Sequence, residues 1–296
     1  MNASQCTVFR ELSQSIAYHL ITTFKGLVCL IAVYRTTMQW NKYGVRFLVH
    51  DNTKTMFRFY LALNLIIASI FGLLHLSELV RLRFDCFLLD FRYILLTRCV
   101  GVCTLASSQN IVFVLSFERL YSTIFPSHFE KHSNKLLAMS LSLITIFGTM
   151  WYGMYLLSDN FRLFQEVHLQ LAMLSPNIPQ NQENFEKLAR TVVMLNCVSF
   201  VTLSIDIYLN FFRKYSKSSL AISYQRSENR RILRTLLPIE LTQTMVVLVT
   251  GILLLIHRTI VPNPSPIEKQ LFLESVTFSA YLPLIISFIV QYSVKR

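Results

Sequence analysis

An acidic and a basic residue, Glu118 and Arg119, stand side by side at the end of a long apolar stretch. Ionised side chains are costly to remove from water, so such a pair at the mouth of a membrane helix is usually ion-paired or functional. The functional interpretation is an electrostatic switch, in which a carboxylate holds Arg119 in one state and releases it in another. The alternative is an interfacial anchor that reaches for the headgroup region.

A second polar segment, Ser-Tyr-Gln-Arg-Ser-Glu-Asn at 223–229, leads into another apolar stretch. Three arginines follow it: Arg230, Arg231 and Arg234. A basic helical extension here would continue the next helix into the cytosol, where Glu228 could be a partner for Arg119. The arginines are equally typical of a cytoplasmic stop signal, because Lys and Arg accumulate on that side.

Five ionisable residues are candidates for intramembrane charges: Lys25, Arg98, Asp206, Glu240 and Glu274. Such residues are rare in lipid and often mark a ligand or ion path. Arg98 and Glu274 fall at similar depth from the same membrane face, which predicts an ion pair. We expect the pair to line a ligand cavity; the alternative is a contact between helices with no ligand.

Two prolines interrupt apolar stretches. Pro238 lies in the cytoplasmic part of the sixth stretch, and Pro283 lies in the seventh. Proline removes one backbone hydrogen bond and kinks a membrane helix. Each kink could be a hinge that lets the helix end swing, or a static packing feature.

The sequence gives little support for an enzyme. His128, Glu130 and His132 form HxExH rather than the HExxH of zinc metalloproteases, and His75 and Glu78 lack further candidate ligands nearby in sequence. The chain contains no phosphate-binding loop, dinucleotide-binding glycine motif or nucleophile elbow. We therefore expect no catalytic residue, metal or cofactor.

Three of the six cysteines, Cys29, Cys103 and Cys197, sit inside apolar stretches and are expected to be small buried hydrophobes. The other three, Cys6, Cys86 and Cys99, lie where oxidation is possible. The sequon Asn2-Ala-Ser makes Asn2 a candidate glycosylation site, which would require an extracellular N-terminus.

The elements that must position these residues are long apolar helices. Hydrophobic residues make up 53% of the 296-residue chain and charged residues 15%, against about 25% in soluble domains. Each apolar stretch reaches the ~20 residues that a helix needs to cross a bilayer. These stretches are 13–34, 55–80, 89–117, 136–157, 189–212, 233–256 and 269–292. They predict a single domain: an all-α membrane protein with a seven-transmembrane helix bundle.

The distribution of Lys and Arg sets the expected orientation. Seven crossings place the termini on opposite sides, and the loops that follow odd-numbered helices hold most of the basic residues, above all 213–234. The richer side should be cytoplasmic. We expect an extracellular N-terminus and read the net charge of +12 as a topology signal, not as nucleic-acid binding.

Several segments together resemble one family, the nematode serpentine chemoreceptors of the class alpha superfamily, and most closely its class alpha/beta branch. The matching segments are His50-Asp-Asn-Thr-Lys54 (HxNxK), Asp85-Cys86-Phe-Leu-Leu89 with Arg98-Cys99, Glu118-Arg119-Leu-Tyr-Ser-Thr123 (ERxxAT), and Tyr224-Gln225 with Glu228-Asn229 (YQxxEN), followed by Leu236-Leu-Pro238. They cover about residues 45–240. The Ala of the ER motif is Ser122 here, and the seventh stretch lacks NPxxY.

The resemblance implies a GPCR-like fold and a G-protein-coupled receptor for an odorant or other small chemical cue. In that family the ER and YQxxEN segments lie at the cytoplasmic face, where a heterotrimeric G protein docks. The implied coupling residues are Glu118, Arg119, Tyr224, Gln225, Glu228, Asn229 and Arg230. The implied location is the plasma membrane, in sensory cilia. The 158–188 loop has no Cys, so Cys86 would pair with Cys6, pair with Cys99 or stay free.

A transporter or ligand-gated channel is the main alternative, with intramembrane Lys25, Asp206, Glu240 and Glu274 lining a path. Duplicated halves, which many transporters contain, are not visible in the sequence. A membrane-embedded hydrolase would need His and acidic ligands facing one cavity, and these are scattered along the chain.

Overall fold

The computed structural model describes residues 2–43, 50–84, 87, 89–131, 135–163, 170–171, 179–212, 220–261 and 264–295. In chain order the elements are α1 (Asn2–Gln14), α2 (Ile16–Tyr43), α3 (Asp51–Arg81), β1 (Leu89–Asp90), α4 (Phe91–Ile124), α5 (Pro126–Lys131), α6 (Lys135–Leu163), β2 (Gln170–Leu171), α7 (Pro179–Ile207), the π-helix η1 (Tyr208–Phe212), α8 (Leu220–Ile260), α9 (Pro266–Val276), the 3₁₀-helix η2 (Phe278–Ala280) and α10 (Leu282–Lys295).

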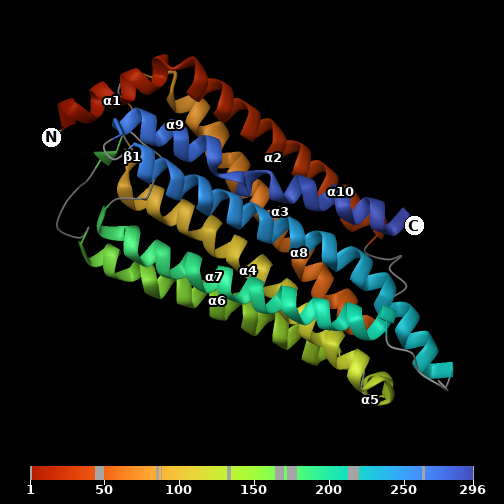
Figure 1. The fold of residues 1–296 in the computed structure, drawn as a ribbon. Coiled ribbons are helices and arrows are strands. Elements are labelled where there is room, and N and C mark those ends of the chain that lie inside the picture. Colours follow the sequence, from red (N-terminus) through yellow and green to blue (C-terminus); the bar gives the residue numbers. More distant parts are fainter. Residues whose placement is uncertain are drawn as a thin grey trace.

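Seven of the helical segments are long and apolar enough to cross a membrane. This confirms the predicted all-α, seven-helix bundle and makes the chain a multi-pass membrane protein. The helices run along one long axis, and the N- and C-termini lie at opposite ends (Figure 1). α4 occupies the centre and packs against α3, α6, α7 and α8, while α10 closes the bundle by packing against α2 and α8.

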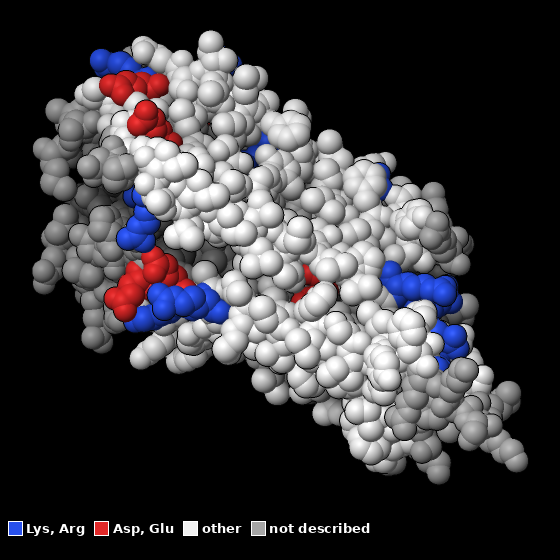
Figure 2. Space-filling model, in the orientation of Figure 1, with Lys and Arg blue, Asp and Glu red and all other residues white. Residues whose placement is uncertain are grey.

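The surface has the pattern expected of a protein solvated by lipid. Large apolar side chains such as Leu73, Ile144 and Trp151 point outward and are more than two-thirds exposed. On the face drawn in Figure 2, most of the charged side chains lie toward the two ends, with a mostly uncharged band between them. Many polar side chains are buried instead, as in membrane bundles where polar contacts join neighbouring helices.

The helices extend beyond the predicted apolar stretches. α8 begins at Leu220 rather than 233, and α7 begins at Pro179 rather than 189. The apolar composition marks where lipid contact ends, whereas helical hydrogen bonding continues into polar sequence. The polar N-terminal residues also form a helix, α1. Its side chains Phe9 and Leu12 are buried against Tyr18 of α2 and Leu82.

The seventh stretch, predicted as one helix over 269–292, is interrupted. α9 ends at Val276, and α10 begins at Leu282 after the single turn of η2. Backbone groups released in lipid need other partners. The Thr250 hydroxyl of α8 donates to the Val276 carbonyl at 3.2 Å, and the Cys29 thiol of α2 lies 3.7 Å from the Ala280 carbonyl. The neighbouring helices therefore stabilise the interruption.

Pro283 is the second residue of α10, not the centre of a kinked helix. Proline is tolerated in the first turn because the N–H that it lacks has no partner there. The prediction that Pro283 kinks a continuous seventh helix is therefore wrong. Pro238, in contrast, lies inside α8, and the helix continues through it without interruption.

Candidate functional site

Arg119 is completely buried near the end of α4, with 0% of its side chain exposed. Its guanidinium makes a two-pronged contact with the neighbouring Glu118: Nε donates to Oε2 at 2.7 Å, and Nη2 donates to Oε1 at 2.6 Å. Nη2 also donates to the Thr53 hydroxyl of α3 at 2.5 Å, and that hydroxyl donates to Glu118 at 3.0 Å. The three side chains close a ring of charge-assisted hydrogen bonds.

The YQxxEN segment of α8 supplies the other side of this site. Asn229 accepts a hydrogen bond from Arg119 Nη1 at 2.9 Å. Glu228 lies further away, with Oε1 4.0 Å from Nη1, and accepts from the backbone N–H of His50 at 2.6 Å. Gln225 lies one turn earlier on the same face and is buried. We call Thr53, Glu118, Arg119, Glu228 and Asn229 the Arg119 cluster.

Hydrogen bonds extend the Arg119 cluster to the fifth membrane helix. The Asn229 amide donates to the Thr123 hydroxyl at 2.8 Å, and Thr123 donates to Asp206 of α7 at 2.5 Å. Asn210, in the π-helical turn η1, donates to the same carboxylate oxygen at 2.7 Å. The widened turn thus brings a polar side chain to Thr123 and Asp206, in line with the frequent occurrence of π-turns at functional sites.

An aromatic side chain covers the guanidinium on another side. The centroid of the Phe129 ring, on α5, lies 5.3 Å from Arg119 Cζ, within the range of a cation–π contact. The His50 ring lies 4.5 Å from Phe129. Arg119 is therefore enclosed by α3, α4, α5 and α8 and has no exposed surface.

The structure brings together five of the seven implied coupling residues: Glu118, Arg119, Gln225, Glu228 and Asn229. Tyr224 is 64% exposed. Arg230 is half-buried, its guanidinium 6.0 Å from the Phe211 ring. Gln225, Glu228 and Asn229 share one face of the helix, and Tyr224 lies at the edge of that face, one turn before Glu228.

Three members of this network were not singled out from sequence: Thr53, Thr123 and Asn210. Thr53 and Thr123 lie inside the quoted HxNxK and ERxxAT segments. The motifs therefore indicated these positions, although a threonine by itself suggests no functional role. Asn210 carried no comparable signal, because a π-turn cannot be recognised from apolar periodicity.

A second buried ionic group lies near the opposite end of the bundle. Arg98 Nη2 of α4 lies 3.0 Å from Glu274 Oε1 of α9, so the predicted pair is in contact. Lys25 of α2, which the sequence did not assign to this pair, lies 2.8 Å from Glu274 Oε2. Gln270 donates weakly to the same carboxylate, at 3.4 Å. We call these four residues the Glu274 cluster.

The Glu274 cluster carries two cations and one carboxylate. Lys25 and Glu274 are buried, and the Nε atom of Arg98 has no hydrogen-bond partner among the described residues. The carboxylate is thus shared by α2 and α4 from opposite sides, and a hydrogen-bond donor remains unused. This arrangement can hold three helices together and can also receive an anionic or hydrogen-bond-accepting group.

The other two intramembrane acids, Asp206 and Glu240, differ in their hydrogen bonding. Asp206 joins the network around Thr123, whereas Glu240 of α8 is buried without a hydrogen bond from any described residue to either carboxylate oxygen. The Ser199 hydroxyl of α7 lies near the Glu240 carboxyl and is hydrogen-bonded to Ser116 at 3.0 Å. Glu240 therefore makes no contribution to either ionic cluster.

The described cysteines and His128 belong to neither cluster. Cys6 is disulfide-bonded, and Cys29, Cys99, Cys103 and Cys197 are free; Cys86 lies outside the described residues. Asn2 begins α1, but its side chain is not among those described. His128 contacts Tyr121, while the Glu130 side chain and His132 are likewise outside the described set. Within the described ranges no group of His, Cys, Asp and Glu could hold a metal.

The sequence matches no family model and no curated protein. The chemistry of the site must therefore be argued from its own geometry. At the centre of the site is a fully buried arginine, Arg119, held by a neighbouring carboxylate and by a second helix. The residues around it offer hydrogen bonds and charge.

Proposed function

We propose that this protein is a G-protein-coupled chemosensory receptor for a small environmental molecule. The observation that carries the proposal is the burial of Arg119 between α4 and α8, where its partners come from the two segments that resemble the ER and YQxxEN motifs. The hydrogen bonds from Arg119 to Asn229 and Thr53 tie α8 and α3 to α4. A movement of α8 away from α4 would break the first of these contacts.

The proposed mechanism is a shift between two arrangements of the bundle. Ligand bound near the Glu274 cluster favours an arrangement in which the end of α8 moves, with Pro238 as the hinge, and Arg119 becomes accessible. The ligand must favour the active arrangement by about 5.5 kcal/mol to change the populations from 1:99 to 99:1. The exposed Arg231 and Arg234, next to Arg226 and Arg230, add positive charge to the surface that receives the G protein.

The same proposal fixes the orientation. The N-terminus is extracellular, the Arg119 cluster faces the cytosol, and the protein resides in the plasma membrane of sensory cells, in their cilia. The disulfide at Cys6 agrees with an oxidising compartment around α1.

The experiment measures basal G-protein activation in a heterologous cell, so that the first result needs no ligand. Wild type, Glu118→Gln and Arg119→Ala are compared at matched surface expression, with Glu183→Gln as a control carboxylate on the exposed part of α7. Glu118→Gln should raise basal signalling because the amide holds Arg119 less tightly. Arg119→Ala should lose signalling in response to an odorant panel, and Glu183→Gln should match wild type.

The same cells distinguish the main alternative. Ionic current or solute uptake on odorant addition, with basal G-protein signalling unchanged by Glu118→Gln and Arg119→Ala, would establish a ligand-gated channel or transporter instead. In that case Glu240→Gln is the first variant to test, because the Glu240 carboxyl has no ion-pair or hydrogen-bond partner among the described residues.

A further inference from the structure

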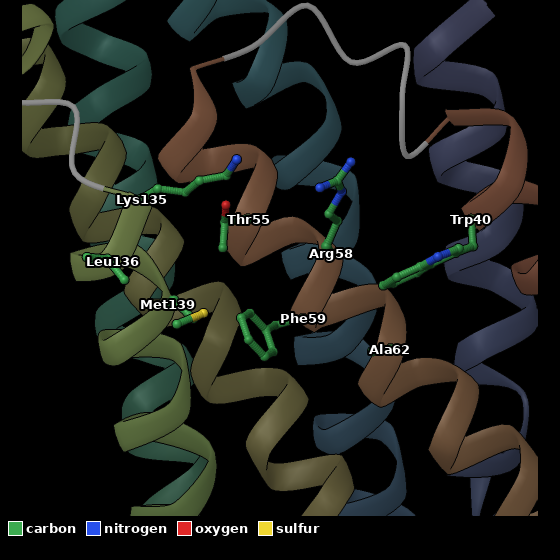
Figure 3. Close-up of a pocket in the computed structure, with 8 residues that line it drawn as sticks. All are labelled: Trp40, Thr55, Arg58, Phe59, Ala62, Lys135, Leu136 and Met139. Carbon is green, nitrogen blue, oxygen red and sulfur yellow. The ribbon is translucent and has the colours of Figure 1, made fainter.

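A groove of about 380 Å³ lies on the outside of the bundle, at the end that holds the Arg119 cluster (Figure 3). It is formed by the last turn of the membrane part of α2, the first turns of α3 and the start of α6. Its apolar lining includes Phe59 and Met139. Arg58 and Lys135 line it as well, and none of the described lining residues is acidic.

The polar and the apolar side chains of the groove lie at different depths. In Figure 3 the Lys135 amine, the Thr55 hydroxyl and the Arg58 guanidinium all lie toward one end, while Phe59 and Met139 lie deeper. Trp40 closes the groove from the side of α2. A tryptophan beside two basic residues is typical of the boundary between hydrocarbon and headgroups.

We propose that this groove binds one anionic phospholipid of the leaflet that it faces. The headgroup phosphate contacts Arg58 and Lys135, the Thr55 hydroxyl donates a hydrogen bond to it, and an acyl chain lies along Phe59 and Met139. The proposal rests on the membrane fold alone and does not depend on signalling, so it can fail or succeed independently of the proposed receptor function.

Charge complementarity favours this occupant over a zwitterionic lipid. Two cations from different helices converge on one side of an otherwise apolar groove. The groove opens toward lipid, since Leu136 and Met139 at its edge are 67% and 40% exposed. Lys135 is the first residue of α6, and Arg58 lies two turns into α3. A long arginine side chain at that depth can reach the headgroups while its stem stays apolar.

The lipid would join three helices that meet at this point. Thr55 and Arg58 belong to α3, Lys135 to α6 and Trp40 to α2. Thr53 stands only two residues before Thr55 but faces the opposite side of α3, where it contacts Arg119. A bound headgroup therefore contacts the outer side of this turn of α3, and the Arg119 cluster contacts its inner side.

The chain offers a local probe, because it contains only two tryptophans, Trp40 and Trp151. Trp40 lines the groove, whereas Trp151 lies in the middle of α6 and is 78% exposed. The full chain carrying Trp151→Phe is reconstituted in nanodiscs of phosphatidylcholine with a fixed fraction of brominated lipid. Quenching of Trp40 by brominated phosphatidylglycerol is compared with quenching by brominated phosphatidylcholine.

Brominated phosphatidylglycerol should quench Trp40 at roughly 25-fold lower mole fraction than brominated phosphatidylcholine does, because two cations face its headgroup. Each cation near an anionic headgroup favours binding by about 5-fold. Arg58→Gln and Lys135→Gln should therefore each lower the preference roughly 5-fold, and Arg58→Lys should retain it. Lys135→Gln changes an exposed side chain at a helix start and keeps the test available if Arg58→Gln does not fold.

Two controls separate a site from general attraction to negative lipid. Lys54→Gln removes a charge from the same end of α3 but from outside the groove, and it should leave the Trp40 preference within about 2-fold of wild type. The converse protein with Trp40→Phe reports Trp151, which should show no preference. Equal quenching of Trp40 by both lipids, or equal effects of Lys54→Gln and Lys135→Gln, would overturn the proposal.

Discussion

The two ionic clusters lie at opposite ends of α4, about 30 Å apart along the helix, and they balance charge in opposite ways. In the Arg119 cluster one cation is surrounded by Glu118, by the more distant Glu228 and by neutral acceptors. In the Glu274 cluster one carboxylate is shared by Lys25 and Arg98. Each cluster therefore has a single central ion, but the central ions carry opposite charges.

The difference concerns how many contacts survive the loss of one partner. Arg119 has donors directed at three separate side chains, so removing one acceptor leaves the others in place. Lys25 and Arg98 both depend on the same carboxylate. Arg119 therefore keeps other partners when one acceptor is lost, whereas Lys25 and Arg98 lose their shared counter-ion together. Four predictions test this contrast, in order of decreasing effect.

Neutralising Glu274 should cause the largest loss. Glu274→Gln leaves the buried Lys25 and the partly buried Arg98 without a counter-ion, and breaking a buried pair in this way costs about 3–5 kcal/mol. We expect poor surface expression and a strongly lowered melting temperature in detergent. Lys25→Met in the Glu274→Gln background should recover part of the loss, because only the partly buried cation then remains. No recovery in the double variant would show that Lys25 does not depend on Glu274.

Neutralising Glu118 should have an intermediate effect. Glu118→Gln weakens a two-pronged charge-assisted contact, while Arg119 keeps Thr53 and Asn229; a loss of about 2 kcal/mol is expected. The same detergent melting assay measures it. A loss as large as that of Glu274→Gln would break the contrast between the two clusters.

Neutralising Glu228 should matter less than neutralising Glu118. Its carboxylate oxygen is 4.0 Å from Arg119, and an amide oxygen at the same position can still accept from the His50 N–H. Glu228→Gln should therefore lower stability by about 1 kcal/mol or less. Comparing its melting temperature with that of Glu118→Gln ranks the two carboxylates. The reverse order would make Glu228 the main counter-ion of Arg119.

Neutralising an exposed carboxylate should have no measurable effect on stability. Glu183 pairs with Lys187 at 2.9 Å on the outer part of α7, where hydrogen bonding to Lys187 lowers the pKa of the Glu183 carboxyl. Exposed pairs contribute little because water and salt screen them. Glu183→Gln should melt at the wild-type temperature. A clear decrease would mean that this part of α7 is covered by another surface.

Much of this architecture followed from the sequence. The count and order of the membrane helices came from apolar length, and the contact of Arg98 with Glu274 came from matching their depths. Lys25 was known as an intramembrane charge, but its place beside Glu274 was not. Depth along a helix can be counted, whereas the face on which a side chain lies depends on how the helices rotate against one another.

Two other features could not be predicted from the sequence, for related reasons. The interruption after Val276 falls in a stretch with no glycine, and Pro283 lies beyond it rather than within it. The donors that stabilise it belong to α8 and α2, far away in the chain. The outward position of Tyr224 beside the inward Gln225 likewise depends on the rotation of α8, which the quoted motif does not specify.

The interruption of the seventh helix also bears on how the chain is inserted during synthesis. α9 and α10 contain 11 and 14 residues, so neither alone reaches the ~20 residues needed to cross the bilayer. The insertion machinery must therefore accept them as one continuous helix. The carbonyls of Val276 and Ala280 can leave their helical hydrogen bonds only after Thr250 and Cys29 lie beside them as new partners. The bent form is thus a product of assembly, and NMR of an isolated 266–295 peptide in micelles should show an unbroken helix.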